Sequence, residues 1–179
     1  MGVPVIDTEQ IEREVVKRKE LIDIITAEFG TEIIKHDGEL DRQKLRQLIF
    51  RDDEARIKLE QLLHPAIYSE VDRRTISLES TYCIVVVPLL FETDQQKRFD
   101  RVLLVDVPVE VQLDRACKRD TSSPGMIQKI IDTQVSRKTR LKLADDIIDN
   151  TVSTEELKKT VNQLHLKYMN SGKPVTTRK

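Results

Sequence analysis

The stretch YCIVVVPLLFE, residues 82–92, decides the fold of this chain, in which 34% of the residues are charged. Its β-branched run Ile84–Val87 has no polar alternation, which predicts a strand buried on both faces of a parallel sheet. Pro88 cannot donate a ladder hydrogen bond, so we expect the strand to end near Val87. The following residues then emerge at the carboxyl end of the strand, where open α/β sheets bind ligands.

Strand-like and helical segments alternate along the rest of the chain. Further strands are expected at residues 3–6, 101–106 and 146–149. Helical spacing is found at residues 8–16, 21–29, 41–49, 52–64, 66–78, 109–119, 126–134, 136–144 and 153–168. The helix that begins at Asp52 or Asp53 should end near His64, because Pro65 follows and would leave His64-Pro65 as a joint between two helices. The alternation predicts an α/β fold with a mainly parallel sheet.

The composition bounds the kind of protein. Thirty Lys and Arg against 31 Asp and Glu give a net charge of -1, which argues against general binding to nucleic acid. No apolar run approaches the ~20 residues of a membrane span, and the first residues do not have the pattern of a signal peptide. Cys83 and Cys117 have neither zinc nor redox spacing and are expected as buried free thiols. We expect a cytoplasmic protein with one domain over residues 1–170 and a polar tail at 171–179.

Several polar residues fall where chemistry is possible, and each has a simpler structural explanation. Asp7 and Glu9 follow a strand-like run, where a carboxylate can act as general base for an alcohol, or can cap a helix and complement its dipole. His64 can bind a ligand or satisfy a helix end. Arg42 can bind an anion or occupy a surface helix position.

A basic group in the second half of the chain is the clearest hint from residue type. Arg115 and Arg119 are one helical turn apart, and Gln134, Arg137, Lys138 and Arg140 follow after a break at residues 121–125. Such a group can clamp phosphates through charge-assisted hydrogen bonds, or can be a solvated basic face.

Seven segments, in this order and spacing, carry a resemblance to a known family: GVPVIDTEQIER (2–13), DGELDRQKLR (37–46), LLHP (62–65), VPLLFE (87–92), RVLLVD (101–106), R-x-x-x-R-D (115–120) and ADDIIDN (144–150). The chain resembles bacterial dephospho-CoA kinases from Gly2 to about Tyr168. The resemblance implies a P-loop kinase fold with a parallel sheet flanked by helices. It also implies a helical substrate-binding region at residues 30–80 and a lid at 119–142.

The resemblance also implies an activity, namely the phosphorylation of the ribose 3′-hydroxyl of dephospho-CoA by ATP. Mg²⁺ is expected to accompany ATP in the full-length enzyme, and the resemblance assigns no metal ligand in this chain. Glu9, together with Asp7, would lie near the reacting hydroxyl. The other implied roles are substrate binding by Arg13, Arg42 and His64, and ATP or lid contacts by Arg115, Arg119, Arg137 and Asn150.

Two departures from the family pattern change what we expect. Family members usually have Asp-x-Asp where this chain has Asp7-Thr8-Glu9, so the implied base is one methylene longer, and a shift of about 1 Å can cost ~10²-fold in rate. Family members also have a first strand, a phosphate loop and its helix before the position of Gly2, and none of the five glycines here belongs to a G-x-x-x-x-G-K-[ST] pattern.

We therefore expect a chain without the first strand and phosphate loop, in which β-strand edges lack partners and ATP-dependent turnover is negligible. The alternatives are a non-catalytic protein that binds CoA-like ligands or a protein partner, and another nucleoside or nucleotide kinase.

Overall fold

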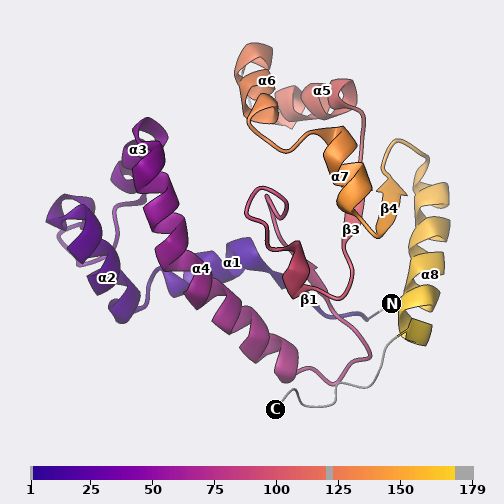
Figure 1. The fold of residues 1–179 in the computed structure, drawn as a ribbon, viewed down its shortest axis with the longest axis horizontal. Helices are drawn as coiled ribbons and strands as arrows, with labels where there is room; N and C mark the ends of the chain where they lie inside the picture. Colours follow the sequence, from indigo (N-terminus) through magenta and orange to yellow (C-terminus); the bar gives the residue numbers. More distant parts are fainter. Residues whose placement is uncertain (1, 120–122, 172–179) are drawn as a thin grey trace. The chain divides into compact units, whose positions relative to one another are not determined.

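The structure, a computed structural model, describes residues 2–119 and 123–171 (Figure 1). Its elements are β1 (Val5–Asp7), α1 (Thr8–Val15), α2 (Lys19–Phe29), η1 (Thr31–Ile33), α3 (Arg42–Arg51), α4 (Asp53–Ile76), β2 (Ile84–Val86), η2 (Gln96–Arg98), β3 (Leu103–Asp106), α5 (Val109–Arg119), α6 (Pro124–Asp132), α7 (Arg137–Leu143), β4 (Asp146–Asp149) and α8 (Thr154–Ser171). The chain divides into two compact units, which meet in the sequence between Pro88 and Leu89 and are described one by one. The predicted substrate-binding region falls in the first unit and the predicted lid in the second. Residues 120–122 of that lid, and the polar tail beyond Ser171, lie outside the described residues.

In the first unit the two strands pair in parallel, as the sequence predicts. Val5 is opposite Ile84 and Asp7 is opposite Val86, so the two strands end side by side. The side chain of Thr8, the first residue of α1, is buried, and its Oγ1 donates a hydrogen bond to the carbonyl of Val86 at 3.0 Å. This bond fixes the start of α1 to the end of β2.

The prediction that Ile84–Val87 is buried on both faces is wrong. Ile84 and Val85 are half-buried, and Val86 keeps 44% of its surface exposed. Among the described residues β1 is the only strand that pairs with β2, so the other edge of β2 has no strand partner. An apolar run indicates that a strand can be buried, but the packing of other elements on its faces decides whether it is.

The core of the first unit lies where α4 contacts α1, α2 and α3 (Figure 1). Ile11, Val15 and Ile25 are completely or almost completely buried. Asp41 and Asp52 cap α3 and α4, each accepting backbone N–H groups of the first turn, and Asp52 is one of the two residues at which the sequence predicts the second of these helices to begin. Gly30 follows α2 with φ of 84°, a conformation that favours glycine, and ends that helix.

The expected break at Pro65 is also wrong, because α4 runs without interruption from Asp53 to Ile76. Proline removes the hydrogen bond to the carbonyl of Gln61, four residues earlier, and crowds that carbonyl. Leu63 and Ile67, on either side of Pro65, are both buried. Their packing holds the helix together through the proline, since tertiary contacts supply most helical stability in proteins.

In the second unit β3 and β4 form a second parallel pair, with Asp106 opposite Asp149. The predicted strand at residues 146–149 is thus confirmed, and the one at 101–106 begins two residues late. Val105 is 56% exposed, so the apolar run of β3, like that of β2, is not buried on both faces.

One buried carboxylate ties the second unit together. Asp146, 9% exposed, accepts hydrogen bonds from Arg101, Lys167 and Tyr168. Burial alone would raise the pKa of Asp146, but these three donors outweigh it and lower the pKa. A capping box lies at the start of α8, since the side chains of Ser153 and Glu156 each accept the other's backbone N–H.

Two findings concern the remaining composition-based expectations. Neither Cys83 nor Cys117 forms a disulfide with a described residue, and both are half-buried rather than buried as predicted. No helix in the described ranges combines the length and apolar character needed to cross a membrane.

Candidate active site

Asp7 is the last residue of β1 and the N-cap of α1. Its Oδ1 accepts the backbone N–H of Glu9 at 2.8 Å, so the helix-capping explanation of Asp7 is correct as far as this bond goes. Within the described residues Oδ2 of Asp7 has no hydrogen-bond partner, and the side chain is exposed. Capping therefore uses one oxygen and leaves the other available to a ligand.

Glu9 lies in the first turn of α1, where a negative charge is favoured by the helix dipole. Its carboxylate is 58% exposed and lies 4.0 Å from Nη2 of Arg13, one turn further along the helix. Asp7 and Glu9 thus present two carboxylates beside the paired ends of β1 and β2. The sequence predicted this juxtaposition, and the roles of the two residues stay predictions.

Glu12 is a member of this group that the sequence analysis missed. Partial desolvation of its carboxyl group raises the pKa of Glu12, although the residue is exposed, and the charge of Arg42 opposes that shift most strongly. Glu9 raises the pKa further, while Arg13 and His64 lower it. All three residues with an expected substrate role therefore act on a single carboxylate. Its spacing of three residues from Glu9, on one face of a helix, is the signal that could have found it.

The three residues predicted to bind substrate come from three different helices. Arg13 is in the last turn of α1 and Arg42 is the first residue of α3, where it is exposed. His64 is half-buried in the middle of α4, and its ring meets the ring of Tyr68 edge-on with the centroids 6.0 Å apart. His64 therefore does not end a helix, which removes the simpler explanation given for it.

Three of the four residues with an expected ATP or lid role come together in the second unit. Nη2 of Arg115 donates to the carbonyl of Asn150 at 3.0 Å, and the backbone N–H of Asn150 donates to the carbonyl of Asp106 at 2.9 Å. The side chain of Asp106 in turn accepts the guanidinium of Arg137. Asp106 is the residue that joins this group, and the sequence analysis missed it. Its position at the end of a strand, like that of Asp7, is the signal that could have found it.

The Asp106–Arg137 pair is closely defined. Nε of Arg137 lies 2.9 Å from Oδ1 and 3.1 Å from Oδ2, and Nη2 lies 2.6 Å from Oδ2. The Asp106 side chain is 9% exposed, and the side chain of Arg137 is 39% exposed. Hydrogen bonding to Asp106 raises the pKa of Arg137, so its charge is firmly held.

The remaining predicted lid residue, Arg119, is exposed at the end of α5. Residues 120–122 follow it and lie outside the described part of the chain. Val135, which follows residues 120–122 in the chain, donates its backbone N–H to the side chain of Glu92 at 2.8 Å. Glu92 thereby links the segment after β2 to the turn between α6 and α7.

Side chains that commonly ligate metals do not cluster in the described part of the chain. Over residues 2–119 and 123–171 no three His, Cys, Asp or Glu side chains lie close enough together to hold an ion. A protein-bound Mg²⁺ commonly uses one or two carboxylates together with substrate phosphates. Any Mg²⁺ in the reaction is therefore expected to arrive bound to the nucleotide substrate.

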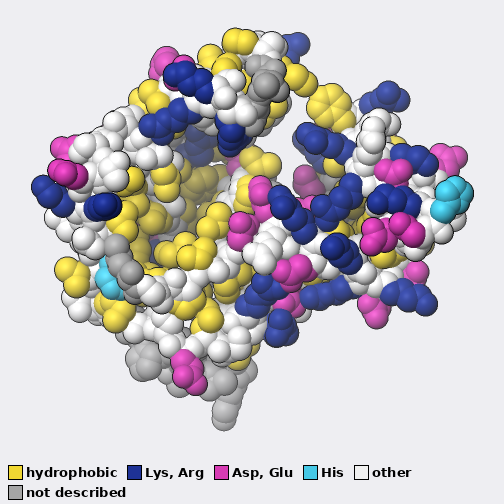
Figure 2. All heavy atoms as spheres, turned by 180° about the vertical axis from the view of Figure 1, so that it is seen from behind, with side chains coloured by type: hydrophobic (Ala, Val, Ile, Leu, Met, Phe, Trp, Pro, Cys, Tyr) yellow, Lys and Arg dark blue, Asp and Glu magenta, His cyan; other side chains and the backbone are white. Residues whose placement is uncertain are grey.

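Basic and acidic side chains are mixed rather than segregated over the helices of the first unit. Figure 2 shows dark blue and magenta side chains next to each other on the side that carries α2, α3 and α4. A single-sign surface of the kind that binds nucleic acid is not visible on that face.

Comparison with known proteins decides the family. The sequence profile of the dephospho-CoA kinases matches residues 1–156. The chain belongs to the dephospho-CoA kinase family. It is accordingly a kinase of coenzyme A biosynthesis, and the other nucleoside or nucleotide kinases drop out as alternatives.

Individual relatives agree with this assignment. The chain is 40% identical over 174 residues to the dephospho-CoA kinase of Mannheimia succiniciproducens, covering 94% of this chain and 81% of the relative. It is 44% identical over 174 residues to that of Pasteurella multocida, covering 94% of this chain and 84% of the relative.

Solved structures agree as well. A Thermus thermophilus protein of known crystal structure matches with a TM-score of 0.79 and 26% identity, over 93% of this chain and 85% of that one. The dephospho-CoA kinase from Campylobacter jejuni matches with a TM-score of 0.69 and 25% identity, over 96% of this chain and 88% of that one. The predicted α/β kinase fold, with parallel strands flanked by helices, is thus confirmed.

Proposed function

We propose that this dephospho-CoA kinase acts in the cytoplasm and transfers the terminal phosphoryl group of ATP to the ribose 3′-hydroxyl of dephospho-CoA, with Glu9 as the proton acceptor. The observation that carries the proposal is the grouping of carboxylates and cationic side chains around α1. Asp7 and Glu9 lie at the paired ends of β1 and β2, and the charges of Arg13, Arg42 and His64 all act on Glu12 of the same helix. The grouping offers a base and an anion-binding surface within one unit.

Glu9 is suited to accept the hydroxyl proton. A general base must come within hydrogen-bond reach of the proton that it removes, and Glu9 is exposed, with only a long ion pair to Arg13. Its backbone is held by the bond from its N–H to Asp7, which fixes the start of the helix. We assign Asp7 the role of orienting this turn and offering its second oxygen to the substrate.

The cationic residues around Glu12 are suited to an anionic acceptor. Dephospho-CoA carries a diphosphate, and arginine recognises such oxygens with paired hydrogen bonds. Arg42 and Arg13 are exposed, so their guanidinium groups can reach a ligand, and His64 adds a ring that is packed against Tyr68. We assign these three residues to binding of dephospho-CoA.

The residues that join at the ends of β3 and β4 are assigned to the nucleotide. Arg115 and Arg137 are both held by hydrogen bonds to groups near the strand ends, and Arg119 is exposed on the same helix as Arg115. Cations placed in this way stabilise the charge of a transferring phosphoryl group. Asn150 belongs to this group through its backbone, whose carbonyl accepts Arg115 and whose N–H donates to Asp106. ATP is expected to bind together with its Mg²⁺.

The first test is equilibrium binding of dephospho-CoA to residues 1–179 by titration calorimetry. Arg42→Gln should weaken binding by roughly tenfold, because one charge-assisted contact contributes about 1.5–3 kcal/mol. Arg46→Gln is the matched control, since Arg46 is exposed on the same helix and makes no hydrogen bond or ion pair with the described residues. Equal affinities for wild type and Arg42→Gln would remove Arg42 from the substrate site.

Turnover is measured in the same samples with ATP and Mg²⁺. None of the glycines in residues 1–179 lies in a phosphate-loop pattern, so we expect these residues by themselves to show a negligible rate, and the proposed transfer requires a phosphate loop in addition to them. A measurable rate would contradict that prediction. In that case Glu9→Gln should lower the rate by roughly 10²–10⁴-fold, the range for loss of a general base, and Glu9→Asp should retain part of it.

A further inference from the structure

The unexplained feature of the second unit is a buried carboxylate at the end of β3. Asp106 is 8% exposed, and burying an ionised carboxylate is costly unless it is paired and hydrogen-bonded. Arg137 supplies that partner from the first turn of α7, 31 residues further along the chain. The pair joins the strand to the segment of the expected lid that carries the arginine.

The geometry of the pair leaves half of the arginine available. A guanidinium has five N–H donors arranged on two usable edges, one formed by Nε and Nη2 and the other by Nη1 and Nη2. Asp106 takes the first edge, since both Nε and Nη2 donate to its carboxylate. Nη1 has no acceptor among the residues that the structure describes, and the side chain is 39% exposed. The second edge is therefore open to a ligand.

We infer that Asp106 is a positioning residue, which holds Arg137 by one edge so that the other edge presents two parallel donors to a phosphate group of ATP. The inference rests on the proposed function, because it names what orients one of the assigned nucleotide contacts. Fixing a rotamer-rich arginine before the ligand arrives reduces the ordering cost of binding. The charges of Asp149 and Glu110 also raise the pKa of Arg137, less than the hydrogen bond to Asp106 does.

The same strand end orders the other residues of the nucleotide group. The carbonyl of Asp106 accepts the N–H of Asn150, and the carbonyl of Asn150 accepts Arg115. Among the described residues, a main-chain carbonyl holds the side chain of Arg115, whereas the carboxylate of Asp106 alone holds the side chain of Arg137. A change from aspartate to asparagine at 106 therefore releases Arg137 and leaves the Arg115 contact in place.

The experiment measures ATP binding by titration calorimetry, in the presence of Mg²⁺, for wild type and for Asp106→Asn, Arg137→Lys and the double variant. Asp106→Asn should weaken ATP binding by about tenfold or more and leave the affinity for dephospho-CoA unchanged. Arg137→Lys should weaken ATP binding by a similar factor, because an ammonium group lacks the two planar edges with which a guanidinium can bond a carboxylate and a phosphate at the same time. The double variant should bind ATP no more weakly than Arg137→Lys alone, because Asp106 acts only through Arg137.

Controls separate positioning from a purely structural role. Asp132→Asn removes an exposed carboxylate of α6 that accepts a hydrogen bond from Gln128, one turn earlier in the helix, and should leave ATP affinity unchanged. Thermal unfolding is followed for every variant, and affinities are compared where the protein is folded. If Asp106→Asn lowers the unfolding temperature but the folded variant binds ATP as tightly as wild type, the inference is overturned and the proposed function stands. If wild type itself does not bind ATP, both the nucleotide assignment and the inference fail, while dephospho-CoA binding still tests the acceptor side.

Discussion

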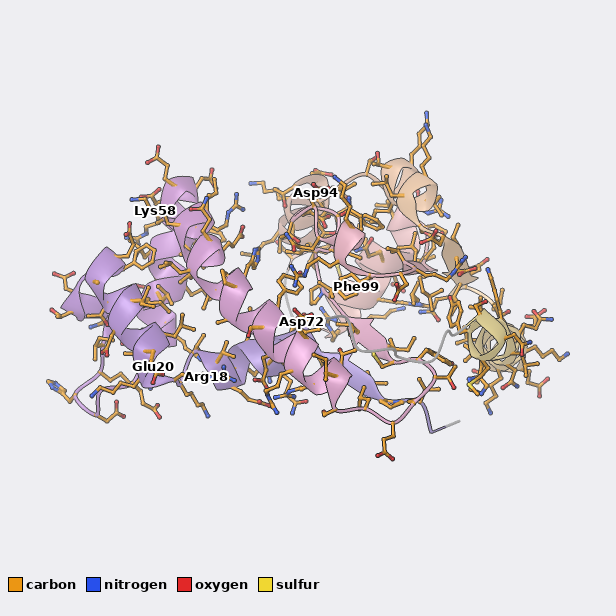
Figure 3. All side chains as sticks on the ribbon, turned by 60° about the horizontal axis from the view of Figure 1, so that its bottom comes forward. Arg18, Glu20, Lys58, Asp72, Asp94 and Phe99 are labelled. Carbon is orange, nitrogen blue, oxygen red and sulfur yellow. The ribbon has the colours of Figure 1, made fainter. Side chains whose placement is uncertain are left out.

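Glu70 offers a sharp test of what holds the α1 site in place. Its side chain in α4 is 5% exposed and accepts four hydrogen bonds from three arginines. Arg18, labelled in Figure 3, reaches it at 2.8 Å from the turn between α1 and α2. Arg73 and Arg74 reach it from the next turn of α4, and Arg74 also pairs with Glu14 of α1. The cluster thus fixes the helix of Glu9 to the helix of His64.

We expect Glu70→Gln to lower the free energy of unfolding by roughly 2–3 kcal/mol. Removing one partner of a buried ion pair costs about 3–5 kcal/mol, because the remaining charge stays buried. The value is reduced here, since Arg18 and Arg73 keep 46% and 67% of their side-chain surface exposed and can be resolvated. Arg74, 27% exposed, is the partner that loses most.

The pH dependence gives the prediction a second and independent readout. Hydrogen bonds from Arg73, then Arg74 and Arg18, hold the pKa of Glu70 well below its ordinary range. A carboxyl group with a lowered folded-state pKa contributes its full stability above the unfolded-state pKa of about 4.3, and loses it as the pH falls toward the folded-state value. The difference between wild type and Glu70→Gln should therefore be full at pH 7 and shrink below about pH 4.

The assay is urea unfolding followed by far-ultraviolet circular dichroism at pH 7 and at pH 3.5. Glu60→Gln serves as the control, because Glu60 lies in the same helix and has no hydrogen bond or ion pair with the described residues. The reasoning is refuted if Glu70→Gln is as stable as this control at pH 7. It is also refuted if the difference persists undiminished in acid.

Two further predictions concern α4 and α1. Pro65→Ala should raise the free energy of unfolding by roughly 1–2 kcal/mol in the same urea assay, since it restores an N–H donor within a continuous helix; destabilisation would show that the proline ring is needed for packing. Glu12→Gln should tighten dephospho-CoA binding about two- to fivefold at pH 8, because it removes a negative charge that competes for Arg42. The pKa of Glu12 is raised, so its carboxyl takes up a proton as the pH falls, and the dephospho-CoA affinity of wild type should then approach that of Glu12→Gln. As a control, Glu20→Gln, which changes an exposed carboxylate of α2 (Figure 3), should leave the dephospho-CoA affinity unchanged at either pH.

Local chemistry explains which parts of the fold could be predicted from the sequence. The caps at Asp41, Asp52 and Ser153 depend on hydrogen bonds to N–H groups two or three residues away, so neighbouring residues determine them. The parallel pairing of the strands follows from their β-branched runs and the helices between them. These features require no knowledge of the rest of the molecule.

The parts that could not be predicted depend on contacts between distant residues. The rule that proline ends a helix is local, and it fails at Pro65 because buried neighbours in α4 hold the helix together. Asp7 and Glu9 could be found because both follow one strand. Glu12 and Asp106 were missed because Arg42, which opposes the pKa shift of Glu12 most strongly, and Arg137, which pairs with Asp106, lie 30 and 31 residues further along the chain.

In each unit a strand ends at an aspartate whose side chain accepts a hydrogen bond from another part of that unit. Asp7 ends β1 and immediately accepts an N–H of the helix that follows, and Asp106 ends β3 and accepts a guanidinium. In the first unit, Oδ1 of Asp7 is bonded within the protein and Oδ2 has no partner among the described residues. In the second, Nε and Nη2 of Arg137 are bonded to Asp106, and Nη1 has no partner among the described residues. A group held in this way needs little reorganisation when a substrate arrives, which is the condition under which fixed charges stabilise a transferring phosphoryl group. The internal bond of each strand-end aspartate is therefore part of the proposed site, and a substitution that spares the ligand-facing atom but breaks that bond should still weaken binding.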